Sequence, residues 1–145
     1  MSEDIKQLVR SVFETVWNHG DAATADRIYA DTYVANIANI PSAIHGVEEF
    51  IQFVALFRAI SPDLRFTVDD QVAEGDKVAT RWTARLKSNG DGLASQSEGE
   101  NIEVTGMSFH QVANGKLVES WDNWDAMTVF QSMGQDVFQS LTLNL

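Results

Sequence analysis

The segment from residue 119 to residue 125 holds the densest set of side chains suited to chemistry. Side chains in a strand alternate between two faces, so Ser120, Asp122 and Trp124 would share one face. Asp122 lies between two tryptophans in the sequence. A carboxylate that such rings shield from water has a raised pKa and exchanges protons more readily with a substrate. The pattern fits equally well an Asp122 that faces solvent or binds a backbone amide, so Asp122 is a candidate general acid or base.

A second polar pair precedes this segment across a hairpin turn. Asn114-Gly115 is a strong signal for a tight turn between two strands. Such a turn brings Ser108 to within about one residue pair of Asp122, although a slip of one residue would swap the faces. His110, on the same strand as Ser108, could orient or protonate a substrate oxygen. The alternative is a half-exposed histidine near the end of a strand.

Other residues could form the walls of a cavity beside these groups. Tyr33 and Asn36 lie between the second and third predicted helices, at the expected mouth or floor of a cavity between helices and sheet. Asn36 could instead be a turn or capping residue, and Trp82 could simply fill the core. The candidate catalytic residues are Asp122 and His110. The candidate substrate-binding residues are Trp17, Tyr33, Asn36, Phe50, Trp82, Ser108 and Trp124.

Hydrophobic periodicity indicates the elements that must position these side chains. A period of 3.6 residues predicts helices over residues 3–19, 22–30, 47–60 and 125–133. Alternation predicts four long strands and a short edge strand, over residues 64–72, 77–87, 101–112, 117–124 and 33–37. We expect Gly20 to end the first helix, and Asp21 and Asp125 to cap later ones. Strict alternation would turn Leu117 away from the face of Asp122. Helices grouped before an antiparallel meander indicate an α+β protein.

The composition excludes several classes of function. The 145 residues suit one domain over 1–145, and 21 acidic against 10 basic residues give a net charge of −11. This surplus repels phosphate backbones and anionic lipids, so no nucleic-acid or membrane partner is expected. The chain has no cysteine, and its three histidines lack ligand-like spacing, so no metal site is predicted. The N-terminal segment lacks the plan of a signal peptide, and a cytoplasmic location is expected.

Five segments, spread in order over nearly the whole chain, carry a family resemblance. They are residues 31–36, 44–50, 62–70, 72–82 and 114–125, the last reading NGKLVESWDNWD. These segments resemble the SnoaL-like polyketide cyclases of the nuclear transport factor 2-like superfamily. The resemblance implies a cone-shaped barrel, in which N-terminal helices pack on a strongly curved antiparallel or mixed sheet around a deep apolar pocket.

The same resemblance implies an activity. In these cyclases an aspartate on the last strand acts as general acid and base for an intramolecular aldol closure, with no metal or organic cofactor. The matching residue here is Asp122. Two pocket histidines of the family fall on Ser108 and Asn36, which can form hydrogen bonds but do not titrate.

The sequence therefore predicts a cofactor-independent enzyme that performs acid/base chemistry on a small hydrophobic carbonyl compound. An isomerase or dehydratase in which His110 polarises a carbonyl is an alternative, and so is a non-catalytic binding or assembly module. Met107, Phe109 and Trp121 or Trp124 would leave an apolar patch on the sheet, so we expect a homodimer or higher homo-oligomer through that face. We expect residues 88–98 to form a loop and the apolar tail over 137–145 to pack on this chain or on a second copy.

Overall fold

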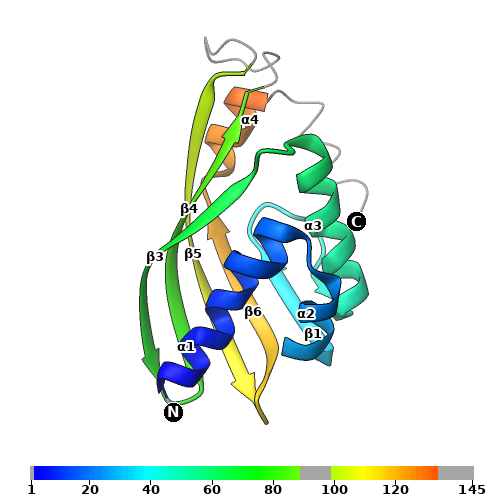
Figure 1. The fold of residues 1–145 in the computed structure, drawn as a ribbon, viewed down its shortest axis with the longest axis vertical. Coiled ribbons are helices and arrows are strands. Elements are labelled where there is room, and N and C mark those ends of the chain that lie inside the picture. The colour runs from blue at the N-terminus through cyan, green and yellow to red at the C-terminus, as the bar shows by residue number, and fades with distance from the viewer. Residues whose placement is uncertain (1, 89–98, 134–145) are drawn as a thin grey trace.

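The computed structural model describes residues 2–88 and 99–133, and Figure 1 shows how their helices and strands are arranged. The loop predicted after residue 88 and the apolar tail lie outside these residues. In chain order the elements are α1 (Ser2–Ser11), the π-helical η1 (Val12–Trp17), α2 (Ala22–Ile28), β1 (Tyr29–Ile37), β2 (Ile44–His45), α3 (Gly46–Ile60), β3 (Arg65–Glu74), β4 (Lys77–Lys87), β5 (Asn101–Ala113), β6 (Lys116–Trp124) and α4 (Ala126–Met133).

The helix ends lie close to where local sequence signals place them. Gly20 has a φ of 62° and leaves the first helical segment in the left-handed conformation that glycine favours. The Asp21 carboxylate accepts a hydrogen bond from the backbone N–H of Thr24 at 3.0 Å and caps α2. The Asp125 carboxylate accepts one from the N–H of Thr128 at 3.1 Å, at the start of α4. These local predictions are confirmed.

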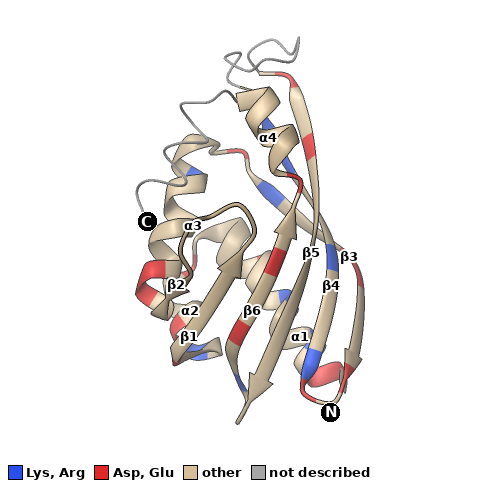
Figure 2. Cartoon of the chain, turned by 180° about the vertical axis from the view of Figure 1, so that it is seen from behind, with Lys and Arg blue, Asp and Glu red and all other residues tan. Residues whose placement is uncertain are grey.

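The six described strands form one curved sheet that does not close, in the order β2-β1-β6-β5-β4-β3. Strand β1 pairs with β6 in parallel, while the other neighbouring pairs are antiparallel. Figure 2 shows the sheet from the side away from α1. The predicted α+β fold with helices on a curved mixed sheet is confirmed. The prediction of a short edge strand over 33–37 is wrong, because β1 runs from Tyr29 and lies between β2 and β6.

A bulge in the last hairpin changes the alternation of side chains. The pairing between β5 and β6 shifts between Gln111 and Val112, which leaves Val118 as the extra residue of a β-bulge. Leu117 is consequently fully buried, with 0% of its surface exposed. The prediction that Leu117 faces away from Asp122 is wrong, since strict alternation does not hold across the inserted residue.

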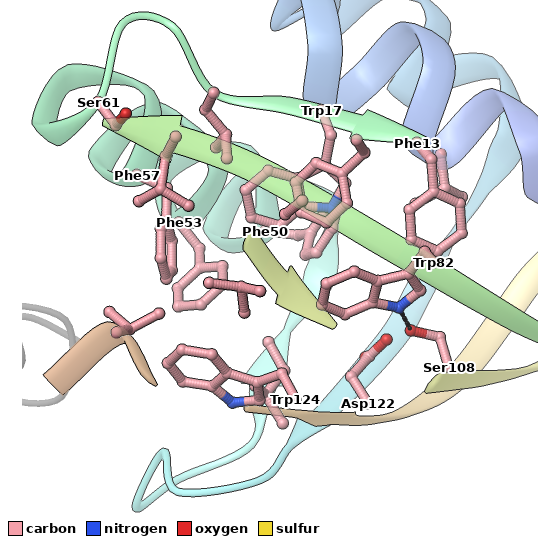
Figure 3. A pocket seen from close by; sticks show the side chains of 18 of the residues that line it. Phe13, Trp17, Phe50, Phe53, Phe57, Ser61, Trp82, Ser108, Asp122 and Trp124 are labelled. Carbon is pink, nitrogen blue, oxygen red and sulfur yellow. Dashed lines mark hydrogen bonds between the residues drawn. The ribbon is translucent and has the colours of Figure 1, made fainter. Parts of the chain in front are cut away.

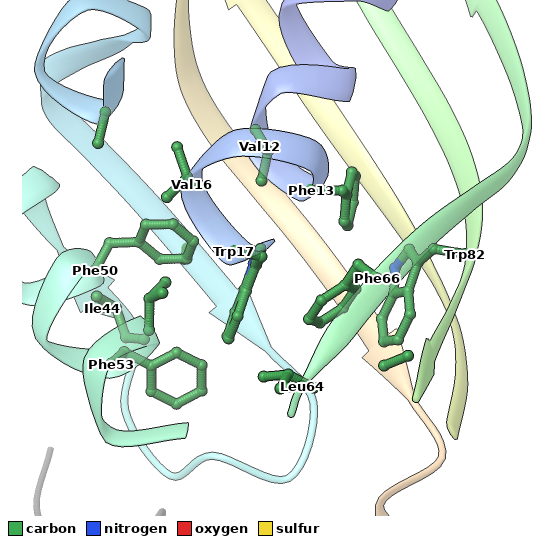
Figure 4. Packing of buried hydrophobic residues seen from close by; sticks show 14 of the residues in the cluster. Val12, Phe13, Val16, Trp17, Ile44, Phe50, Phe53, Leu64, Phe66 and Trp82 are labelled. Carbon is green, nitrogen blue, oxygen red and sulfur yellow. The ribbon is translucent and has the colours of Figure 1, made fainter. Parts of the chain in front are cut away.

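The core lies between the concave side of the sheet and the helices, and aromatic rings dominate it (Figure 4). Trp17 on η1 is central: its ring centroid lies 4.9 Å from that of Phe66, and its ring meets Phe50 and Phe53 edge to face at 6.1 Å. Such rings supply much of the apolar surface buried on folding. They also fix η1 against α3 and β3, the elements that flank the site.

The opposite side of the sheet carries apolar side chains in contact with solvent. The exposed fractions are 61% for Met107, 40% for Phe109 and 39% for Trp121. The rings of Phe109 and Trp121 lie 6.0 Å apart on neighbouring strands. The homo-oligomer expected from the sequence stays a prediction, and sedimentation at micromolar concentration would check it.

Candidate functional site

An apolar cavity lies between the inner face of the sheet and the segments η1, α3 and α4 (Figure 3). Its volume is about 80 Å³, counted as the space that the centres of water-sized molecules can occupy. One water needs roughly 10–15 Å³ by this measure, so the cavity has room for a small organic molecule. All the candidate residues except Asn36 line it: Trp17, Tyr33, Phe50, Trp82, Ser108, His110, Asp122 and Trp124.

Asp122 is the carboxylate that the sheet presents to this cavity (Figure 3). Its Oδ2 accepts a hydrogen bond from the Ser120 hydroxyl at 3.0 Å. The Tyr33 hydroxyl lies 2.6 Å from Ser120 Oγ. Burial, followed by the charge of Asp122, raises the pKa of Tyr33 well above its usual value. Because Ser120 gives its single hydroxyl hydrogen to Asp122, the protonated Tyr33 is the donor to Ser120 Oγ, and the pair orients Asp122.

We expect Ser120→Ala to lower the free energy of unfolding by about 1–3 kcal/mol, because it leaves the Tyr33 hydroxyl buried without its partner. Urea unfolding of the wild type and of Ser120→Ala measures this loss. The double variant Tyr33→Phe/Ser120→Ala should lose less than the sum of the two single variants, because it removes both hydroxyls together. Strictly additive losses would contradict the coupling.

Ser108 lies directly opposite Asp122 in the β5–β6 pairing, within the range of one residue that the sequence left open. Trp82 Nε1 donates to Ser108 Oγ at 2.9 Å, the bond drawn as a dashed line in Figure 3. The indole reaches Ser108 by lying across Gly106, which has no side chain in its way. A Cβ at Gly106 would lie only 2.2 Å from Cζ2 of Trp82. The positions of Trp82, Gly106 and Ser108 therefore depend on one another.

His110 lies deeper in the cavity and has only 1% of its surface exposed. Its ring meets Phe13 edge to face at 6.2 Å, and its Nδ1 has no hydrogen-bond partner within residues 2–88 and 99–133. Burial lowers the pKa of His110 below its ordinary 6.5, while the charge of Asp122 acts in the opposite direction. At neutral pH the ring is therefore uncharged.

This lowered pKa makes stability depend on pH. At pH values between the pKa of His110 in the folded protein and 6.5, His110 is protonated in the unfolded chain but neutral in the folded protein. The free energy of unfolding therefore falls as the pH drops below about 6.5, by at most about 1.4 kcal/mol per pH unit. When the pH falls from 7.5 to 5.5, the free energy of unfolding should decrease less for His110→Gln than for the wild type. Urea unfolding at both pH values measures this difference. Parallel pH profiles for the two proteins would contradict this.

Asn36 does not reach the cavity, contrary to the sequence-based expectation. Its amide nitrogen donates to the Glu119 carboxylate at 2.9 Å and to the backbone carbonyl of Ser120 at 3.0 Å. Alternation along β1 turns Tyr33 and Ile37 into the cavity and Asn36 to the other face. Asn36 ties β1 to β6 and is not placed to contact a ligand in the cavity.

A family model for the SnoaL-like polyketide cyclases matches residues 7–133, which includes all the elements that form the cavity. The chain belongs to this family. No individual curated protein matches this SnoaL-like chain significantly.

Solved structures give the same picture of the fold. IdmH from Streptomyces antibioticus, itself a proposed polyketide cyclase, is 27% identical, with a TM-score of 0.74 over 86% of this chain and 94% of its own. A proposed SnoaL-like polyketide cyclase from Jannaschia sp. CCS1 is 19% identical, with a TM-score of 0.78 over 91% and 92% of the two chains. A de novo designed protein with a curved β-sheet also matches, at 16% identity and a TM-score of 0.71, over 100% and 99% of the two chains. The fold alone therefore does not define an activity.

Three residues of this SnoaL-like site were not among the sequence candidates: Ser61, Gly106 and Ser120. Alternation along β6 already places Ser120 on the face of Asp122, so that residue had a signal. Alternation along β5 likewise places Gly106 on the face of Ser108, and Ser61 precedes the proline that ends α3, but nothing in the sequence indicates the contact of Gly106 with Trp82 or the place of Ser61 in the cavity lining. Among the described residues, no three His, Cys, Asp or Glu side chains gather as metal ligands. In the same ranges, no helix is long and apolar enough to span a membrane.

Proposed function

We propose that this SnoaL-like protein is a cofactor-independent enzyme that performs aldol-type acid/base chemistry on a small hydrophobic carbonyl compound. Asp122 is the general acid and base. One observation carries this proposal: among the described residues that line the apolar cavity, Asp122 is the single carboxylate. A positioned carboxylate is a suitable group to take a proton from a carbon next to a carbonyl and to return it later.

In the proposed reaction, the Asp122 carboxylate removes a proton from the carbon beside one carbonyl and leaves an enolate. The enolate carbon then forms a bond to a second carbonyl carbon of the same molecule. The oxygen of that second carbonyl takes the proton back from Asp122, so that no atom or electron is gained or lost. The aromatic walls contribute by holding the reacting carbons close together.

Ser108 is the residue that we assign to the developing negative charge on the substrate oxygen. Its Oγ accepts from Trp82 Nε1 at 2.9 Å, and it faces Asp122 across the strand pair. The Ser108 hydroxyl hydrogen has no acceptor assigned among the described residues, so it is available to donate to a substrate oxygen. A donor oriented in advance stabilises an enolate without having to reorganise during the reaction.

An isomerase is the second candidate, and the state of His110 favours it. The ring is neutral, lines the cavity and has an unpartnered Nδ1. A neutral imidazole can hydrogen-bond a carbonyl while Asp122 moves a proton between two carbons. Analysis of the products separates the two reactions, because isomerisation closes no ring.

Exchange of α-protons tests the chemistry common to both candidates. The wild-type protein would be incubated in D₂O with a panel of aryl ketones and 1,3-diketones, and deuterium uptake beside the carbonyl would be followed by proton NMR. We expect uptake above the buffer rate for at least one ketone. Buffer-level uptake across the whole panel would contradict the proposal.

A further inference from the structure

The hydroxyl of Ser61 is a buried polar group at the end of the cavity away from Asp122 (Figure 3). Ser61 has only 4% of its surface exposed, and its Oγ has no hydrogen-bond partner among the described residues. The side chains beside it along the cavity wall are apolar, those of Phe57, Ile60 and Leu64. An unpaired hydroxyl in such surroundings has lost its water without compensation.

The fold does not use this hydroxyl. At the C-terminal end of α3, the backbone N–H of Ser61 donates to the carbonyl of Phe57 at 2.9 Å. The carbonyl of Ser61 accepts from the backbone N–H of Leu64 at 3.0 Å. The helix end and the following turn are therefore satisfied by main-chain groups, and an alanine could take the same conformation. What the hydroxyl lacks is a partner inside the cavity.

Ser61 and Asp122 lie at opposite ends of the cavity lining (Figure 3), so a molecule that contacts both must extend along the cavity. Among the described lining residues there is no lysine or arginine. A carboxylate or phosphate beside Ser61 would therefore be buried without a counter-charge, whereas a neutral oxygen needs only the hydroxyl.

We infer that Ser61 is a specificity residue that binds a neutral oxygen at the far end of the ligand. The ligand then carries its reacting carbonyl at Asp122 and a hydroxyl or second carbonyl at Ser61. This inference rests on the proposed function for the orientation of the ligand. Its test measures binding instead of turnover, so that the two proposals can fail separately.

The test compares 2-acetylnaphthalene with its analogues that carry a hydroxyl on carbon 5, 6 or 7. Isothermal titration calorimetry would give the affinity of each ketone for the wild type and for Ser61→Ala. We expect at least one hydroxylated ketone to bind the wild type about 5- to 10-fold more tightly than the parent, which is the effect of one neutral hydrogen bond. Ser61→Ala should lose this gain and keep its affinity for the parent.

Two further proteins make the result specific. Asp122→Asn should keep the preference for the hydroxylated ketone, even though its proton exchange is impaired. Ser132→Ala, which removes a buried hydroxyl outside the cavity lining, should also keep it. The inference is overturned if no hydroxylated ketone binds the wild type more tightly than the parent, or if the gain survives in Ser61→Ala.

The Tm of Ser61→Ala without ligand supplies an independent measurement. Because Ser61→Ala removes an unpaired polar group, its Tm should equal or exceed that of the wild type. A Tm lower by several degrees would overturn the inference, since the hydroxyl would then serve the fold and not a ligand.

Discussion

Asp122→Asn should lower the rate of α-proton exchange, and of any ring closure, by roughly 10²–10⁴-fold. The amide has nearly the shape of the carboxylate, so it can occupy the same site between Ser120 and the cavity, but it cannot accept a proton at neutral pH. Ketone binding should change little, because the aromatic walls supply most of the contact with the ligand. Exchange by NMR and binding by calorimetry on the same ketone measure the two effects separately.

The matched control for this variant is Asp26→Asn. Asp26 is an exposed residue of α2 and does not line the cavity. The Asp26→Asn substitution removes the same charge as Asp122→Asn, and the variant should exchange α-protons at the wild-type rate. Wild-type exchange by Asp122→Asn would refute the assignment of Asp122 as the acid/base group, whereas equal losses in both variants would point to net charge as the cause.

Gly106→Ala should be the most damaging single-methyl change in the site. The new Cβ would overlap the Trp82 indole, with Cζ2 at 2.2 Å and Cη2 at 2.5 Å. Trp82 packs against both Phe13 and Phe66, with centroid separations of 6.2 and 5.0 Å, and these two rings resist its displacement. We expect a loss of about 1–3 kcal/mol in the free energy of unfolding. We also expect weaker ketone binding, because displacing the indole breaks its bond to Ser108.

Urea unfolding and calorimetry measure both effects, and a second substitution tests their cause. Trp82→Phe removes part of the ring that the new methyl would strike, so Gly106→Ala should cost less in that background. Thr105→Ala, one residue earlier and on the exposed face, is the control and should stay close to the wild type. A Gly106→Ala protein with wild-type stability would show that the sheet accommodates the methyl.

The predictions that succeeded from sequence rest on local interactions. Helix periodicity, the caps at Asp21 and Asp125 and the stop at Gly20 each depend on a few neighbouring residues, and the structure reproduces them. The hairpin at Asn114-Gly115 was equally local, and it placed Ser108 within about one residue pair of Asp122; the bulge decided the exact register. A carboxylate that faces an apolar cavity was one of two alternatives that the sequence left open.

Two outcomes depended on strand pairing, which local sequence does not specify. Parallel pairing with β6 makes β1 an internal strand, whereas the outward side of Asn36 follows from alternation with Tyr33 along the strand predicted over 33–37. The bulge at Val118 brings Leu117 inward, and nothing in the alternating pattern marks an inserted residue.

By itself, the sequence determined the long helices and the four long strands, their caps, the α+β class and the family, because periodicity, capping and motif order are written in consecutive residues. Only the tertiary structure decided which polar groups meet. It set the Tyr33–Ser120–Asp122 chain, the indole of Trp82 over Gly106 and the unpaired hydroxyl of Ser61. Each of these depends on residues from distant segments approaching within a few ångströms, and that approach is fixed by the curvature of the sheet and by the packing of η1 and α3 against it.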